Sequence, residues 1–237
     1  MPQKLCCRVG QVVHHGGQVY SLELYPERPV PRFQPGQFLH LAIDPYQPGD
    51  YWPESRVFSI ASSPDHREQI TITYSVVGAF TKRMEKEVCP DKNVWIKLPY
   101  GEFVIKGENE VALVAGGTGI TAFTSFLDGL PGNRQLKVSL FYGVRTRDLL
   151  IFHPLIEKLK NESELFSAWY FIEEGETEGS KGFIPGRLSV SSIMPHVINP
   201  GSTDFYLSGP PGMLKQLCAD FKFEGLLPGQ IKIDAWE

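Results

Sequence analysis

The stretch VALVAGGTGIT at residues 111–121 decides the fold of this chain. Its first five residues are an unbroken apolar run, which is typical of a strand buried on both faces of a parallel sheet. Three glycines, Gly116, Gly117 and Gly119, then turn the chain sharply into a helix. Such a turn lets the backbone approach a pyrophosphate, and the helix N-terminus offers free N–H groups. Because the spacing is G-G-x-G and not G-x-G-x-x-G, a tight turn without a ligand is the alternative.

Downstream of this stretch, apolar runs alternate with helical segments to the end of the chain. The runs lie at residues 111–115, 138–142, 168–172, 204–207 and 231–233, and helices are expected at 120–130, 152–160, 186–193 and 212–223. This alternation predicts an α/β domain over residues 110–237. Its core would be a doubly wound parallel sheet of five strands.

Upstream, up to about residue 105, the sequence is typical of β-structure. Apolar and polar residues alternate at 19–25, 37–43, 69–74 and 93–98, and Pro- and Gly-rich segments separate these runs. The pattern predicts an N-terminal antiparallel β-barrel domain over residues 1–105. A hairpin is expected at residues 14–17, a short helix at 79–87 and a short linker at 106–109.

The composition narrows the classes of function. The chain has 237 residues and a net charge of -4, which argues against a nucleic-acid-binding protein because such proteins usually carry a basic excess. No apolar run approaches the roughly 20 residues that span a bilayer. The first residues lack the apolar core of a secretion signal, so we expect a cytoplasmic protein. The cysteines lack the spacing of metal or iron–sulfur ligands, so free thiols and no metal site are expected at Cys6, Cys7, Cys89 and Cys218.

A second motif, RVFS at residues 56–59, ends a Pro-rich loop and begins a strand. Strand alternation sends Arg56 and Phe58 to one face and Val57 and Ser59 to the other. An arginine can pair with a phosphate, an aromatic ring can stack on a flat ligand, and a hydroxyl can bond a ring nitrogen. The alternative is an ordinary strand with an exposed arginine and a core phenylalanine. The glycine-initiated helix start at 78–81 adds a second position for a phosphate and favours the ligand interpretation.

With these motifs in this order, the chain resembles the ferredoxin–NADP reductase family over nearly its whole length. The family's signatures are R-x-[YF]-[ST], G-x-x-[ST], P-x-G-x-F, G-G-T-G-I, C-G-P-x-x-M and a late aromatic residue. They stand here at residues 56–59, 78–81, 99–103, 116–120 and 208–213 and at Trp236. The resemblance implies an FAD-binding barrel followed by a domain that binds NADH or NADPH.

The resemblance also implies roles for single residues. Arg56 would pair with the FAD pyrophosphate, Phe58 would stack on the isoalloxazine, and Ser59 would lie near flavin N5. Trp236 would cover the flavin or its adenine side. The candidate residues of the barrel are Arg56, Val57, Phe58, Ser59, Thr73, Tyr74, Gly78, Ala79, Phe80 and Thr81. Those of the second domain are Gly117, Thr118, Gly119, Ile120, Thr121, Arg145, Arg147, Ser208, Gly209, Pro210, Pro211 and Met213.

Three residues depart from the family pattern. Phe58 replaces the commoner tyrosine, which keeps the stacking surface but loses a hydroxyl. Ser208 replaces the usual cysteine at the hydride-transfer site. Asp234 stands where many members carry a glutamate that is a possible proton relay. The resemblance thus implies Ser59, Ser208 and Asp234 as the catalytic residues.

The choice between NADH and NADPH stays open in the sequence. Relatives that use NADPH often hold its 2′-phosphate with a Ser-Arg pair after the third strand of the nucleotide domain. Here that region reads FIEE at residues 171–174, and its carboxylates would repel a phosphate. Arg145 and Arg147 would attract a phosphate, or they are solvated loop charges. Taken together, these charged residues favour NADH over NADPH.

The expected reaction is that of an oxidoreductase, a flavoprotein that takes a hydride from NAD(P)H onto FAD and passes electrons to an acceptor. We expect no attached iron–sulfur domain, so the acceptor would be a separate protein or subunit, such as a ferredoxin-like carrier or an oxygenase component, or a small molecule. Lys82, Arg83, Lys86, Lys92 and Lys97 would dock an acidic carrier or form a plain solvated face. The alternatives are a reductase of free flavin, a non-catalytic electron-transfer subunit and a dinucleotide sensor. A monomer or loose oligomer is expected.

Overall fold

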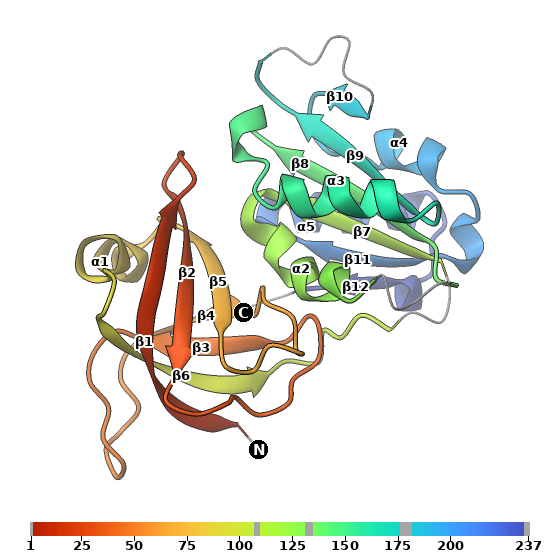
Figure 1. Cartoon of the computed structure of the whole chain (residues 1–237). Helices are drawn as coiled ribbons and strands as arrows, with labels where there is room; N and C mark the ends of the chain where they lie inside the picture. The colour runs from red at the N-terminus through yellow and green to blue at the C-terminus, as the bar shows by residue number, and fades with distance from the viewer. Residues whose placement is uncertain (1, 107–109, 131–134, 176–181, 235–237) are drawn as a thin grey trace. The chain divides into compact units, whose positions relative to one another are not determined.

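The computed structural model describes residues 2–106, 110–130, 135–175 and 182–234. The chain divides into two compact units (Figure 1). We call them the barrel unit, Met1–Val104 with Thr124–Phe126, and the nucleotide unit, Ile105–Phe123 with Leu127–Glu237. Most of the expected linker lies outside the described residues.

The barrel unit is a six-stranded sheet in the order β4-β3-β6-β1-β2-β5, with every neighbouring pair antiparallel. Its elements are β1 (Gln3–His14), β2 (Val19–Pro26), β3 (Phe38–Ala42), β4 (Ser55–Ser59), β5 (Ile70–Ser75), α1 (Ala79–Glu87) and β6 (Asn93–Tyr100). The Ala61 N–H donates to the Thr71 carbonyl at 2.9 Å, which brings the two edges of the sheet together. The predicted antiparallel barrel and the hairpin between β1 and β2 are confirmed.

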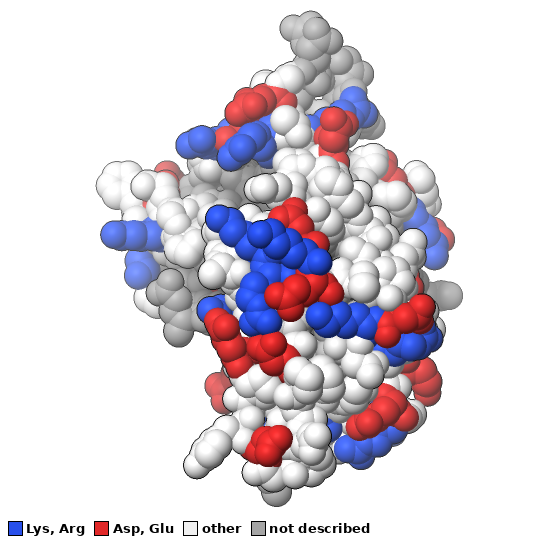
Figure 2. Space-filling view, turned by 90° about the vertical axis from the view of Figure 1, so that its left-hand side faces the viewer, with Lys and Arg blue, Asp and Glu red and all other residues white. Residues whose placement is uncertain are grey.

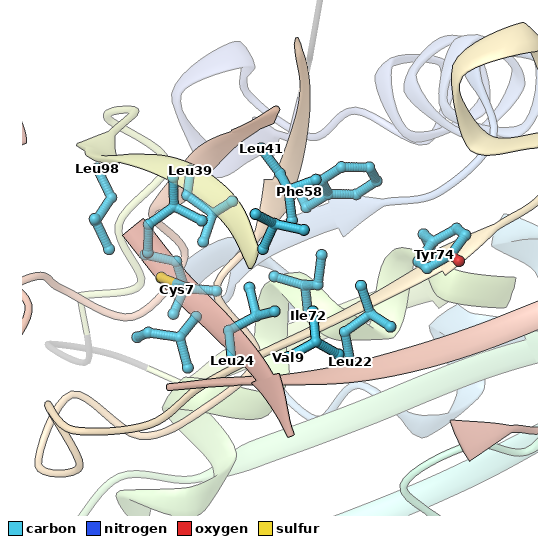
Figure 3. Close-up of a cluster of buried hydrophobic side chains, with 14 of the residues drawn as sticks. Cys7, Val9, Leu22, Leu24, Leu39, Leu41, Phe58, Ile72, Tyr74 and Leu98 are labelled. Carbon is cyan, nitrogen blue, oxygen red and sulfur yellow. The ribbon is translucent and has the colours of Figure 1, made fainter. Parts of the chain in front are cut away.

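Alternation along the strands builds the barrel core. Every second residue of β1, β2 and β5 points into one cluster of buried side chains, as the pleat of a strand requires (Figure 3). Burial raises the pKa of Cys7 in this cluster, so its thiol stays protonated. Phe80 and Met84, four residues apart on α1, are buried in the same cluster. Their burial anchors α1 and fixes the position of its N-terminus.

The nucleotide unit is a six-stranded parallel sheet in the order β10-β9-β8-β7-β11-β12. Its strands are β7 (Val111–Gly116), β8 (Val138–Val144), β9 (Phe166–Ile172), β10 (Phe183–Pro185), β11 (Asp204–Ser208) and β12 (Ile231–Ile233). The predicted doubly wound architecture is confirmed, and five of these strands were expected. The count of five was wrong because β10, a strand of three residues, adds a sixth strand at the edge of the sheet.

Helices lie on both faces of this sheet. The α-helices are α2 (Thr121–Asp128), α3 (His153–Glu162), α4 (Val190–Ile193) and α5 (Pro211–Phe223). The 3₁₀ turns are η1 (Gly117–Ile120), η3 (Arg147–Leu149), η4 (Met194–His196), η5 (Pro200–Ser202) and η6 (Pro228–Gln230). Residues of α4 and α5 pack on the core of one face, and α3 crosses the other (Figure 1). The helix expected at 186–193 begins only at Val190, because Ser189 is its N-cap.

The order of the strands reverses beside β7. From β7 the chain adds β8, β9 and β10 on one side, and it then returns to place β11 and β12 on the other. In an open parallel sheet such a reversal leaves a crevice at the carboxyl ends of the two central strands, where ligands bind. Those ends are Gly116 and Ser208, so the fold brings the two glycine motifs of this unit together.

Among the helices of the described ranges, none combines the length and the apolar character needed to cross a bilayer.

Candidate functional site

In the barrel unit, Arg56 of β4 stands beside the first turn of α1. Its guanidinium carbon lies 5.1 Å from the centre of the Phe80 ring. The same group pairs with Glu54 at 2.9 Å and remains exposed. The structure therefore joins the two barrel motifs, and we call Arg56, Phe58, Ser59 and residues 78–81 the barrel site.

The N-terminus of α1 is capped by the chain itself. The Thr81 hydroxyl oxygen accepts hydrogen bonds from the N–H groups of Val77 (2.9 Å) and Gly78 (3.1 Å), and it lies 3.2 Å from the Gly78 carbonyl. The first helical hydrogen bond runs from the Lys82 N–H to that same carbonyl at 3.0 Å. The N–H groups of residues 79–81 are thus left without a helical acceptor. Thr81 contributes to the barrel site by holding these groups in place.

Neither the backbone conformation nor the packing of the described residues requires a glycine at position 78. The Gly78 φ of -109° suits any residue, and a Cβ added there would meet no atom of the described residues within 4 Å. Glycine is also used where a ligand approaches the backbone closely. An anionic group bound against these N–H groups, within reach of Arg56, fits the open space in front of Gly78.

Phe58 and Tyr74 form the aromatic end of the barrel core. Their ring centres are 5.9 Å apart, and Phe58 is 9% exposed (Figure 3). Burial raises the pKa of Tyr74, so its phenol stays neutral. The adjacent Ser59 is buried at the end of β4. Phe58 is therefore a core side chain with a remaining exposed edge, as the alternative interpretation of its strand foresaw.

Thr73 does not share the face of Tyr74. Its hydroxyl lies 2.6 Å from that of Ser21, which in turn lies 2.7 Å from Nε2 of His15. Neighbouring residues of a strand point to opposite faces, so Thr73 and Tyr74 cannot line one surface. The Thr73 hydroxyl is engaged within the barrel sheet, and a contact of Thr73 or Tyr74 with the cofactor stays a prediction.

In the nucleotide unit, the backbones of the two glycine motifs, residues 116–121 and 208–213, are in close contact. A Cβ at Gly119 would collide with the carbonyl group of Ser208 and would lie 2.7 Å from the Gly209 nitrogen. Gly117 has a φ of +54°, a left-handed conformation that favours glycine. We call residues 116–121 and 208–213, with Asp234, the dinucleotide site.

Other predicted residues of the dinucleotide site stabilise its turn, lie in the core or begin α5. The Thr121 hydroxyl donates to the Thr118 carbonyl at 2.8 Å, and Thr121 is buried. Ile120 is 0% exposed, so its side chain belongs to the core, and its assignment as a cofactor contact stays a prediction. Pro210 and Pro211 are exposed and begin α5.

Two of the three predicted catalytic residues are joined by a hydrogen bond. The Ser208 hydroxyl donates to Oδ2 of Asp234 at 2.9 Å, and both side chains are buried. The Asp234 N–H donates to the Leu207 carbonyl at 2.9 Å, which holds the aspartate at the end of β11. The third predicted residue, Ser59, belongs to the barrel unit. Trp236 lies outside the described residues.

The charged groups after β8 and β9 are mostly engaged. The guanidinium carbon of Arg147 lies 4.4 Å from the centre of the Phe183 ring. Nε of Arg187 donates to Glu173 at 2.8 Å, while Arg145 and Glu174 are exposed. The sequence analysis missed Arg187 because only the unexpected strand β10 returns it to the end of β9.

The predicted basic face on α1 is interleaved with acidic residues (Figure 2). Arg83 pairs with Asp44 at 2.8 Å and with Glu87 at 3.0 Å, and Lys92 lies 3.7 Å from Glu87. The hydrogen bonds from Arg83 lower the pKa of Asp44 and of Glu87. This mixture is typical of a solvated surface.

In the described ranges, no cluster of three or more His, Cys, Asp or Glu side chains is arranged to hold a metal ion. The four cysteines are free thiols.

A family model described as the oxidoreductase NAD-binding domain matches residues 113–219. The chain is 32% identical over 215 residues to a probable dihydroorotate dehydrogenase B (NAD(+)), electron transfer subunit, from Methanopyrus kandleri; the match covers 90% of this chain and 72% of that protein. The chain belongs to the ferredoxin reductase-like family of FAD- and NAD-binding oxidoreductases.

Other relatives are longer than the region they share with this chain. The anthranilate 1,2-dioxygenase electron transfer component of Acinetobacter baylyi is 27% identical over 189 residues, which are 77% of this chain and 52% of that protein. The match to the flavohemoprotein of Deinococcus radiodurans spans 46% of its length. A crystal structure of the Amycolatopsis cytochrome P450 reductase GcoB shares the fold, with a TM-score of 0.85, 19% identity and coverage of 99% of this chain and 70% of that one.

Proposed function

We propose that this protein is an FAD-dependent NADH reductase that passes electrons to a separate carrier protein or oxygenase component. The observation that carries the proposal is the open space at Gly78, in front of the free N–H groups of α1 and beside Arg56. This arrangement suits the pyrophosphate of a flavin nucleotide. The dinucleotide site lies at the point in the sheet where nicotinamide nucleotides bind in such folds.

In the barrel site, the N–H groups of residues 79–81 and the Arg56 guanidinium would hold the FAD pyrophosphate. The hydroxyl of Ser59 would bond the flavin ring, and the edge of Phe58 would lie against it. Bound FAD supplies the chemistry that no side chain offers, accepting two electrons together and releasing them singly.

In the dinucleotide site, Ser208 and Asp234 would orient the nicotinamide. Because the Ser208 hydroxyl donates its hydrogen bond to Asp234, its lone pairs are left to accept a hydrogen bond from the nicotinamide carboxamide. The buried carboxylate of Asp234 would stabilise the positive charge that the nicotinamide ring acquires when it loses a hydride. The turn at Gly117 would hold the phosphates.

We further propose NADH as the preferred donor. The carboxylate of Glu173 is fixed at the end of β9 by Arg187, where it can accept hydrogen bonds from ribose hydroxyls. The 2′-phosphate of NADPH would bring a further negative charge to Glu173 and Glu174. Arg147 is stacked on Phe183 and would have to leave that ring to offset the repulsion.

Two other functions have support from named relatives. An NAD(P)H-flavin reductase of Vibrio harveyi is 30% identical over 149 residues, which favours a reductase of free flavin. A substrate held by its ring alone would make no use of the pyrophosphate position at Gly78. The Methanopyrus kandleri relative is named as an electron transfer subunit, which favours a component of a larger complex.

Purification followed by desalting tests the proposal. We expect yellow protein whose flavin is released by denaturation and identified as FAD by chromatography. With NADH it should reduce ferricyanide, and NADPH should support a slower rate. Colourless protein that reduces added riboflavin would establish the free-flavin reductase instead. Yellow protein that neither NADH nor NADPH reduces would establish the electron-transfer subunit.

A further inference from the structure

Met213 lies in the first turn of α5, at the centre of the dinucleotide site. Its side chain is half-buried and packs against the same core cluster as Met194. The sequence analysis placed Met213 among the cofactor contacts. The neighbours of Met213 in the structure indicate a different role.

The thioether of Met213 lies over two glycines at the ends of different strands. A Cβ at Gly116, the last residue of β7, would lie 2.5 Å from Sδ and 2.8 Å from Cε of Met213. A Cβ at Gly209, the first residue after β11, would lie 2.5 Å from the same Cε and 3.1 Å from the Cα of Gly116. One side chain therefore fills the space above both glycines and touches the segments that lead into both motifs.

Gly116 is explained by this contact and not by its backbone. Its φ of -113° is open to any residue, and it is fully buried. The position of its missing Cβ is taken by Met213 and, at 3.1 Å, by Cδ of Pro210. An unbranched thioether suits a narrow and irregular gap of this kind.

We propose that Met213 is a positioning residue that clamps the end of β7 to the start of the 208–213 segment, and so fixes the N–H groups of the dinucleotide site. It acts through Gly116 and Gly209 and does not itself bind the nucleotide. The proposal deepens the proposed function, because it takes the ligand to be a nicotinamide dinucleotide. The fixed site binds more tightly since the loops need not be ordered on binding.

Truncation of Met213 with a matched control tests the clamp. Met213→Ala and Met213→Val both remove Sδ and Cε, whereas Met213→Leu keeps most of the volume. Met194→Ala removes an equivalent side chain from the same core cluster and leaves the glycines untouched. By titration calorimetry of FAD-loaded protein with NAD⁺, we expect Kd to rise about tenfold for Ala and Val and less than about threefold for Leu and for the control.

Amide hydrogen exchange in the nucleotide-free protein gives a readout that does not depend on the ligand. Exchange at residues 116–121 and 209–213 should be faster in Met213→Ala and Met213→Val and unchanged in Met194→Ala. Unchanged exchange together with an unchanged Kd would overturn the proposal. If the wild-type protein does not bind NAD⁺ and the exchange still differs, the proposed function has failed and the clamp stands. If Met213→Ala does not fold, the Val variant carries both measurements.

A double-mutant cycle with Gly116→Ala tests the contact itself. The added methyl group displaces the flexible thioether in the wild-type background, so the single variant should bind NAD⁺ about tenfold more weakly. After Met213→Ala the thioether is gone, and the double variant should bind no more weakly than Met213→Ala alone. Additive losses would overturn the proposal.

Discussion

The two sites use glycine for opposite reasons. At the barrel site, Gly78 faces open space, and within the described ranges no atom lies close to the position of its missing Cβ. At the dinucleotide site, Gly116, Gly119 and Gly209 have that position filled by Met213 or by backbone. The first glycine borders open space, which we propose a ligand fills, and the other three leave room for the chain.

A glycine-rich turn after a strand therefore does not by itself report a ligand. In both sites a threonine hydroxyl stabilises the turn that leads into the helix, because Thr81 and Thr121 each bond a carbonyl three residues earlier. The two motifs share this spacing between threonine and carbonyl, although the packing around their glycines differs. Only the neighbours in space distinguish the glycines that are packed against the chain from the one that borders open space.

The largest effect is expected from Gly119→Ala. The new methyl group meets the backbone of Ser208 and Gly209, which cannot rotate away as a side chain can. We expect a loss of about 1–3 kcal/mol in the free energy of unfolding and at least about a hundredfold weaker NAD⁺ binding. Urea unfolding and calorimetry measure the two. Retained FAD would show that the damage is confined to the dinucleotide site, and unchanged NAD⁺ affinity would contradict the comparison.

Asp234→Asn tests the chemistry of the dinucleotide site. The amide keeps the shape and an acceptor for Ser208 but removes the buried charge, so NADH-dependent ferricyanide reduction should slow about tenfold in kcat. Asp204→Asn is the control, since Asp204 pairs with Lys232 at 2.6 Å on the same two strands, outside the dinucleotide site. Equal rates for Asp234→Asn and the wild-type protein would remove Asp234 from the mechanism.

Gly78→Ala is the counterpart of Gly119→Ala in the barrel unit. With no atom within 4 Å and no left-handed φ, the methyl group should change the free energy of unfolding by less than about 1 kcal/mol. FAD should bind about tenfold more weakly, because the methyl group enters the space for the pyrophosphate. Fluorescence titration of the flavin-free protein gives the Kd. Gly212→Ala, at the open and exposed first turn of α5, should leave FAD affinity unchanged; a Gly78→Ala variant that binds FAD normally would refute the ligand-facing role.

Thr81→Val separates the helix cap from the ligand. It removes the acceptor for the N–H groups of Val77 and Gly78 and should cost about 1 kcal/mol of stability. Thr81→Ser keeps the hydroxyl and should restore most of the loss. Thermal unfolding of the flavin-free proteins compares them, and equal stability of all three would show that the cap contributes nothing.

The smallest effect concerns the exposed ion pairs on α1. Arg83 lowers the pKa of Asp44 in the folded state, so the contribution of this pair is present above the unfolded pKa and is lost as the pH falls through the folded value. The stability difference between the wild-type protein and Arg83→Gln should therefore be constant near neutral pH and shrink below about pH 4. Urea unfolding across this range measures it. A difference that grows on acidification has the wrong sign for this account.

Much of the architecture follows from local patterns. Alternating residues in β2, β3 and β5 predict the barrel, and the buried runs of β7 and β8 predict the parallel sheet. Period-two and period-3.6 patterns are set by neighbours in sequence, so one chain suffices to see them.

The parts that sequence reasoning missed depend on contacts between distant segments. Arg187 reaches Glu173 only because three residues of β10 pair with β9. Thr73 is engaged by Ser21 across two strands, 52 residues away. Met213 touches Gly116 through a fold reversal that no local pattern records. Each of these contacts concerns the partner of a side chain and not the secondary structure in which that side chain lies.

Anaerobic rapid mixing of FAD-loaded protein with NADH tests the central claim most directly, because it follows electrons from one nucleotide to the other with no acceptor present. We predict that the absorbance of oxidised flavin falls in a rapid phase whose rate saturates with NADH and is slower with NADPH. Flavin that stays bound and stays oxidised at saturating NADH would contradict the account.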